Sequence, residues 1–212
     1  MFQTDHYHPV SRAVVRLLLA GLLAWPMVAT AQLGGLLPAS PTVLGDASAV
    51  QATVLGTTTI LAGTGSLADT TDARDASQLT GGIPSLLGAG ALHATTIGWP
   101  DQVASEASLG NLNLTVAGIA VSADLVMARA LAVLGAVGSG GSNIDNLVIN
   151  GIPIGVTGQP NQTIAVPGGQ VILNEQTLSA TGSKVNALHL VVGNVLTGVA
   201  DVVIASATAG IS

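Results

Sequence analysis

The sequence feature that most constrains the fold is a two-residue alternation of aliphatic side chains between residues 143 and 176. This segment reads NIDNLVINGIPIGVTGQPNQTIAVPGGQVILNEQ, and Asn-Gly, Gln-Pro-Asn and Pro-Gly-Gly interrupt its alternation. A period of two is typical of a half-buried strand, and the interrupting residues are typical of tight turns. The chain is therefore expected to be built from β-strands.

One hairpin is expected at Asn150-Gly151, which separates two aliphatic runs. Asn-Gly is the strongest short-range hairpin signal, because a type I′ turn needs φ > 0 at both of its central residues. A two-residue loop pairs the flanking residues so that the aliphatic side chains share one face. These side chains belong to Leu147, Ile149, Ile152, Ile154 and Val156.

Further strands are expected along the chain, and one long loop is expected at residues 69–85, where charged residues, Gly and Pro gather. The strand candidates contain SAVQATVLG, TTTILAG, GALHATTIG, DQVASEASLGNLNLTVAG, QTIAVP, QVILNEQ, KVNALHLVVG and GVADVVIASATAG. Residues 119–135 fit either a strand or one short helix that Ser122 caps and Gly135 closes. The surrounding strands favour the strand.

The last runs of the chain are apolar on both faces, which favours the interior of a two-sheet sandwich over an open sheet. The chain contains no cysteine, so burial alone has to stabilise it. We expect an all-β protein with a single β-sandwich-like domain of short antiparallel strands, covering residues 46–212.

The first 31 residues are typical of a signal peptide that is cleaved on export. Arg12 and Arg16 precede the apolar run LLLAGLLAW, and Ala29-Thr30-Ala31 supplies a cleavage site. The mature chain is then expected to begin at Gln32, and residues 32–45 are expected to form a lead-in arm.

The charge of the mature chain argues against nucleic acid as a partner, and its sequence argues against a membrane span. The leader contains two of the 5 basic residues and one of the 11 acidic residues, which leaves 3 against 10 and a net charge of −7. Such a chain is not expected to bind nucleic acid. It is also not expected to contain a transmembrane segment, because Asn194 and Asp201 interrupt the apolar runs near its end.

The C-terminal half, residues 140–210, resembles the choice-of-anchor P family of bacterial secreted proteins. The resemblance rests on the order of Asn-Gly-x-Pro, Pro-Asn-x-x-Ile-x-Val-Pro, Asn-Glu-Gln and Asn-Ala-Leu-His in this sequence. It implies export and placement at the cell surface or outside the cell, through sorting tails that differ between members, and it implies no defined activity. Because no LPxTG motif or basic tail follows Ile211 and Ser212, a released or matrix-associated protein is expected.

Few side chains are candidates for chemistry, and we expect no catalytic residue, no cofactor and no enzyme activity. His189 alternates with Val185, Ala187 and Val191, which indicates a buried structural histidine rather than a catalytic one. A hydrolytic site would have to pair His189 or His93 with Glu175 or Glu106, and no hydrolase motif accompanies them. Asp69, Asp72 and Asp75 are weak candidates for calcium ligands, since solvated loop acids usually explain such spacing.

These observations favour a secreted or cell-surface β module of structural or adhesive type, with a periplasmic location as a further option. Its expected partner is a protein or matrix surface, or a second copy of itself. One alternative is a self-associating matrix or fibre subunit, in which runs such as ALHLVVG add strands edge to edge. A secreted hydrolase or a small-ligand binder is the less favoured alternative.

Overall fold

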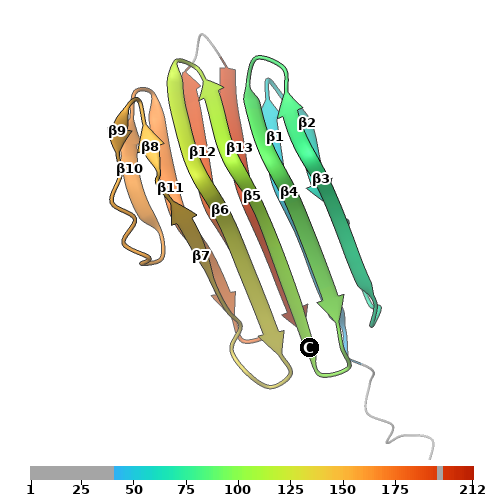
Figure 1. Cartoon of the computed structure of the whole chain (residues 1–212). Coiled ribbons are helices and arrows are strands. Elements are labelled where there is room, and N and C mark those ends of the chain that lie inside the picture. Colours follow the sequence, from blue (N-terminus) through green and yellow to red (C-terminus); the bar gives the residue numbers. More distant parts are fainter. Residues whose placement is uncertain (1–40, 195–197) are drawn as a thin grey trace, which may run out of the picture. The chain divides into compact units, whose positions relative to one another are not determined.

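The computed structural model describes residues 41–194 and 198–212 (Figure 1). The predicted signal peptide and residues 32–40 of the predicted arm lie outside this part of the chain. Within it, every regular element is a β-strand, and no helix is long and apolar enough to cross a membrane. The strands are β1 (Val43–Val54), β2 (Thr57–Gly63), β3 (Ala73–Ile83), β4 (Leu87–Gly98), β5 (Gln102–Val116), β6 (Ile119–Val133), β7 (Ser139–Asp145), β8 (Val148–Ile149), β9 (Ile152–Pro153), β10 (Gln162–Val166), β11 (Gly169–Ser179), β12 (Gly182–Asn194) and β13 (Gly198–Ile211).

Two antiparallel sheets pack face to face, which confirms the predicted all-β sandwich. Sheet A has the strand order β10-β11-β12-β13-β1-β2, and sheet B has the order β3-β4-β5-β6-β8-β9, with β7 also paired to β6. The two sheets form two layers with closely aligned strands (Figure 1). Strand β13, at the centre of sheet A, packs against β5 and β6 at the centre of sheet B.

Several boundaries differ from the expectations. The sandwich begins at Val43 rather than at residue 46, because Val43 is buried and pairs with Ile211. Residues 119–135 contain strand β6 and no helix. The prediction of a loop over residues 69–85 is wrong, since most of that segment forms β3. As an edge strand exposed on both faces, β3 has the polar, Gly-containing composition of a loop.

The predicted turn at Asn150-Gly151 is confirmed. Asn150 has φ of 50° and Gly151 has φ of 79°, and Ile149 pairs with Ile152 across the turn. The shared buried face is only partly formed, because Ile149 is buried whereas Ile152 is 64% exposed.

A row of unpaired residues, here called the crease, runs across both sheets. On its two sides, opposite sets of alternate residues in each long strand point to the core. In sheet A the residues on the two sides of the crease pair regularly, but one residue per strand is left out of the ladder. In β13 the buried residues are Val202 and Ile204 before the crease and Ala207 and Ala209 after it, so the buried position changes from even to odd. The residues of the crease are Ala62, Ala49, Ala205, Ala187 and Asn174 in sheet A, and Leu79, Ala91, Asn111 and Asp124 in sheet B.

Positive φ angles explain the reversal in β2, β11, β13, β4 and β5, whereas the crease residues of β1, β12, β3 and β6 have no positive φ. Ala62, Ala205 and Asn174 have φ of 46°, 53° and 51° in sheet A, and Ala91 and Asn111 have φ of 49° and 51° in sheet B. A single left-handed residue inserts one extra position and sends the next side chain to the opposite face. In each long strand, with or without such a residue, the two segments on either side of the crease have opposite in–out alternation.

The core differs on the two sides of the crease. At the end that carries the C-terminus in Figure 1, small residues such as Ala47, Ala107 and Ala209 face inward. The other half contains the large aliphatic residues Leu112, Leu114, Ile119, Leu188, Leu190 and Ile204. Alanine is thus more frequent in the interior on the C-terminal side of the crease, where Leu67, Leu92 and Leu109 are also buried.

Polar bonds join the two sheets at the small-residue end. The Ser105 hydroxyl donates to the Thr208 carbonyl at 2.6 Å and lies 2.7 Å from the buried Thr96 hydroxyl, and the Ser183 hydroxyl donates to the Ser139 carbonyl at 2.8 Å. A side chain at Gly138 would place its Cβ 2.2 Å from the Gly182 carbonyl oxygen, so only glycine fits there. Small inward residues therefore let the two backbones approach closely.

Candidate functional site

The densest group of polar side chains lies on the outer face of sheet A, beside the crease. Neighbouring strands β11, β12 and β13 contribute Glu175, His189 and Asp201 to it. They border a shallow depression of about 300 Å³. The depression is lined by Gln51, Glu175, Thr177, Lys184, Asn186, His189, Asp201 and Val203.

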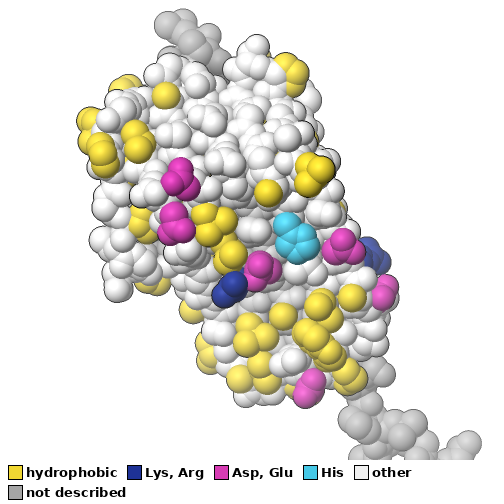
Figure 2. Space-filling view, viewed as in Figure 1, with side chains coloured by type: hydrophobic (Ala, Val, Ile, Leu, Met, Phe, Trp, Pro, Cys, Tyr) yellow, Lys and Arg dark blue, Asp and Glu magenta, His cyan; other side chains and the backbone are white. Residues whose placement is uncertain are grey.

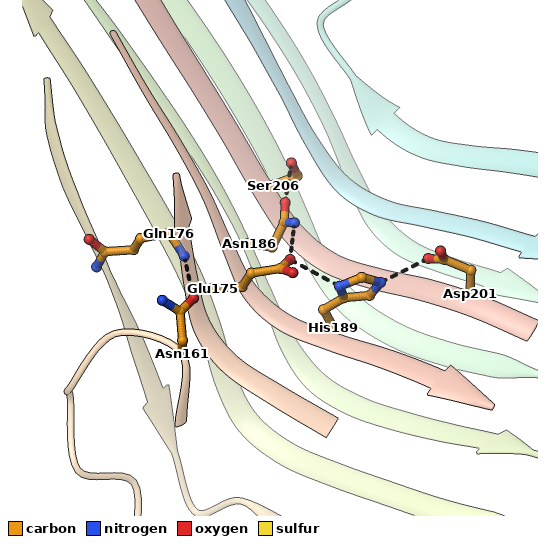
Figure 3. A network of polar contacts seen from close by, with 7 residues as sticks. All are labelled: Asn161, Glu175, Gln176, Asn186, His189, Asp201 and Ser206. Carbon is orange, nitrogen blue, oxygen red and sulfur yellow. Dashed lines mark hydrogen bonds and ion pairs between the residues drawn. The ribbon is translucent and has the colours of Figure 1, made fainter. Parts of the chain in front are cut away.

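His189 bridges two carboxylates (Figure 3). Its Nδ1 lies 2.9 Å from Glu175 Oε2, and its Nε2 lies 3.1 Å from Asp201 Oδ1. The side chain of His189 is 16% exposed, whereas those of Glu175 and Asp201 are 29% and 49% exposed. The imidazole is thus the most enclosed member of a chain of three groups that crosses three strands.

This geometry defines the protonation state that satisfies both contacts. An ionised carboxylate only accepts hydrogen bonds, so each ring nitrogen beside one has to carry a proton. With Glu175 and Asp201 ionised, both bonds form together only to the doubly protonated imidazolium of His189. Each ring nitrogen of His189 is in any case directed at a carboxylate of the protein.

Asn186 extends the network away from the ring. Its side-chain nitrogen donates to Glu175 Oε2 at 2.6 Å, and its Oδ1 accepts the Ser206 hydroxyl at 2.8 Å (Figure 3). The Ser206 hydroxyl is directed at an amide oxygen and not at His189, so the group lacks the nucleophile–base contact of a hydrolase. The arrangement links β11, β12 and β13 across their outer face.

A second set of amide bonds fixes the segment before β10 to β11. The Asn161 Oδ1 accepts the backbone N–H of Gln176 at 3.0 Å, as Figure 3 shows. The side-chain nitrogen of the buried Asn174 donates to the Gly158 carbonyl at 2.9 Å. Asn174 therefore has two structural roles: its backbone is left-handed at the crease, and its side chain holds the segment before β10.

The structure corrects the placement of His189. The prediction that its side chain shares a face with Ala187 is wrong, since Ala187 is buried and His189 is directed to the outer face. The crease explains the difference, because the alternation reverses between Ala187 and Leu188. The sequence did not indicate Asp201 as a site residue. Its position beside the His189 ring depends on the pairing of β12 with β13, which sets Asp201 opposite Val191.

The other candidate residues do not join this site. Glu106 forms an ion pair with Arg129 at 2.7 Å on the outer face of sheet B, and His93 lies on the neighbouring strand β4 of the same sheet. The predicted calcium ligands Asp69, Asp72 and Asp75 are not brought together. Within residues 41–194 and 198–212, no three His, Asp or Glu side chains converge in a way that could hold a metal ion.

Comparison of the chain with protein-family models, with curated proteins and with solved structures found no match. The choice-of-anchor P resemblance therefore stays a prediction.

Proposed function

We propose that the protein is exported and acts at the cell surface or in the extracellular matrix as a structural or adhesive β module without catalytic activity. The observation that carries this proposal is the site on sheet A. Both nitrogens of His189 are bonded to carboxylates, and the neighbouring Ser206 hydroxyl is bonded to Asn186. The histidine and the serine of this polar group are thus both held by other side chains of the protein, which supports a role in linking strands β11, β12 and β13.

A contact surface is available on the other sheet. The outer face of sheet B contains a groove between β4, β5, β6 and β7, which Ile97, Ala104, Met127 and Leu131 line with apolar atoms. Figure 2 shows hydrophobic side chains gathered at the same end of this face. An apolar area of this kind favours a partner protein that presents apolar side chains of its own.

Adhesion of a matched pair of variants tests this proposal. Leu131→Asp places a charge in the groove, whereas Leu79→Asp places the same charge on the edge strand β3, where the leucine is 91% exposed. We expect Leu131→Asp to reduce binding of the purified protein to the producing cells and their matrix, and Leu79→Asp to bind like the parent. Equal binding by all three proteins would contradict the assignment of this surface.

A second pair of variants tests the absence of catalysis. His189→Gln should lower the melting temperature, because glutamine cannot donate to Glu175 and Asp201 with the same geometry, yet adhesion of the folded protein should be kept. The lost bonds are partly solvent-screened, so the expected cost is about 1–2 kcal/mol. His93→Gln on sheet B serves as the control. A variant that melts like the parent but loses a turnover reaction would refute the proposal.

A further inference from the structure

The two edges of sheet A lack the features that usually protect an exposed edge strand. Edge strand β2 reads TTTILAG and edge strand β10 reads QTIAV, and neither contains a charged residue or a proline. Short uncharged segments with high β propensity are prone to strand addition. Among the described residues, the backbone-to-backbone bonds of β2 go only to β1, and those of β10 go only to β11.

The edges of sheet B are protected in contrast. Strand β3 carries Arg74 and Asp75, and the crease interrupts its pairing at Leu79. At the other side, β9 has two residues and one of them is Pro153, while β7 ends at Asp145. Charges, a proline and an interrupted ladder are the devices by which natural sheets avoid edge pairing. The absence of such devices is therefore specific to sheet A.

The two unprotected edge strands, β2 and β10, occupy the same rows of paired residues across sheet A. Following the paired residues from strand to strand, Thr57 of β2 shares a row with Val166 of β10, and Leu61 shares a row with Gln162. The first of these rows runs Thr57, Val54, Ala200, Val192, Gly169, Val166. The last runs Leu61, Val50, Ile204, Leu188, Leu173, Gln162. A second copy in the same orientation thus meets residues 57–61 with residues 166–162, without a shift along the strands.

The strand directions of the two edges are also complementary. All neighbours in sheet A are antiparallel, so the direction alternates from β10 through β11, β12, β13 and β1 to β2. With six strands, the two edges run in opposite directions. The β2 edge of one copy therefore meets the β10 edge of an identically oriented copy as an antiparallel partner.

The free hydrogen-bonding groups occur in matching rows. Two-residue turns at Leu55-Gly56 and Pro167-Gly168 make the pairs that flank them hydrogen-bonded ones, namely Val54 with Thr57 and Val166 with Gly169. Bonded and non-bonded pairs alternate along an antiparallel ladder. The backbone groups directed outward are then those of Thr58 and Ile60 in β2, and of Ala165 and Thr163 in β10, which stand in the same two rows.

We propose that copies of this protein associate head to tail through sheet A, with β2 of one copy pairing with β10 of the next. The contact joins two different surfaces, so it leaves one edge free at each end and extends into a filament rather than closing as a symmetric dimer. This inference goes beyond the adhesive role and is independent of it, because assembly is measured on the purified protein alone.

Two edge variants test the proposal when they are examined separately and together. Ile60→Pro and Ala165→Pro each remove an outward N–H without removing a bond inside the sheet. We expect sedimentation velocity to show the parent growing in size with concentration and each variant remaining monomeric. The mixture should form a one-to-one dimer and nothing larger, because each variant then supplies the edge that the other lacks.

Controls keep the test decisive. Leu79→Pro alters an edge strand of sheet B and should assemble like the parent. If circular dichroism shows that either proline variant is unfolded, the single variants Ile60→Lys and Ala165→Lys replace the two proline variants in the same experiment. A parent that stays monomeric up to its solubility limit would overturn the proposal. A single edge variant that still dimerises would also overturn it, since it would indicate a symmetric contact. Adhesion of the monomeric variants then shows separately whether the proposed function depends on assembly.

Discussion

Replacement of alanine by glycine should affect neighbouring positions of β13 differently, because the crease gives them different backbones. Ala205 and Ala207 are both fully buried on the same strand. Ala205 has φ of 53°, whereas Ala207 has no positive φ and pairs regularly with Ala47 and Val185. The pair therefore isolates the effect of the left-handed backbone from that of burial.

The expected magnitudes follow from three contributions. Ala207→Gly loses one buried methyl group, which costs about 0.8 kcal/mol, and adds backbone freedom to a strand, which costs about 0.5–1 kcal/mol. Its free energy of unfolding should fall by about 1.5 kcal/mol. Ala205→Gly has the same two costs but is relieved of a left-handed strain of about 1–2 kcal/mol. Its net change should be close to zero.

Urea denaturation followed by circular dichroism measures the free energy of unfolding of both variants, and thermal denaturation gives their melting temperatures. For a domain of this size, the loss in Ala207→Gly should lower the melting temperature by about 3–6 °C, while Ala205→Gly should melt near the parent. Equal destabilisation of the two variants would show that Ala205 has no unusual backbone, and it would refute the explanation of the crease by left-handed residues.

Three further outcomes are expected. Gly151→Val should destabilise the protein by about 1–3 kcal/mol in denaturant titration, because valine is strained at positive φ, whereas Gly141→Val has equal open space and an ordinary backbone and serves as control. Ser105→Ala should lower the free energy of unfolding by about 1–3 kcal/mol, because the Thr208 carbonyl loses the Ser105 hydroxyl as a donor. Ser108→Ala on the outer face is the control and should change it little; equal losses in the two variants would contradict the role of Ser105 in joining the sheets. Mass spectrometry of exported protein should find Gln32 at the N-terminus, and an intact Met1 would contradict cleavage.

The sequence was sufficient for the fold class and for several turns, because these depend on local patterns. Asn150-Gly151 encodes a turn through two residues that tolerate positive φ, and Pro167-Gly168 encodes one through the fixed φ of proline followed by a glycine at positive φ; the structure has both turns. Aliphatic alternation predicted strands without an alignment of relatives. The strands β5 and β6, at 15 residues each, cover most of the segments 101–118 and 119–135 in which strands were expected, because the crease reverses the alternation without ending the strand.

The site could not be predicted to the same extent, and the crease is again the reason. A strict period of two places His189 with Ala187, but the extra residue in each strand places it with the outward residues Val191 and Val203. Its partner Asp201 depends on the register between β12 and β13, which no local pattern encodes. In the alternative of a self-associating subunit, ALHLVVG does not supply the pairing edge, since β12 lies between β11 and β13 inside the sheet.

The crease also restricts which changes in chain length the domain tolerates. Because neighbouring strands each carry one extra residue in the same row, a deletion in a single strand cannot be absorbed locally. Removing Ala205 would turn Asp201 and Val203 towards the core and Val202 and Ile204 towards solvent, while the strands on both sides keep their alternation. Insertions at the hairpin loops avoid this conflict. Length variation among natural sequences of this fold should therefore be confined to loops, and strand lengths should change only in several strands at once.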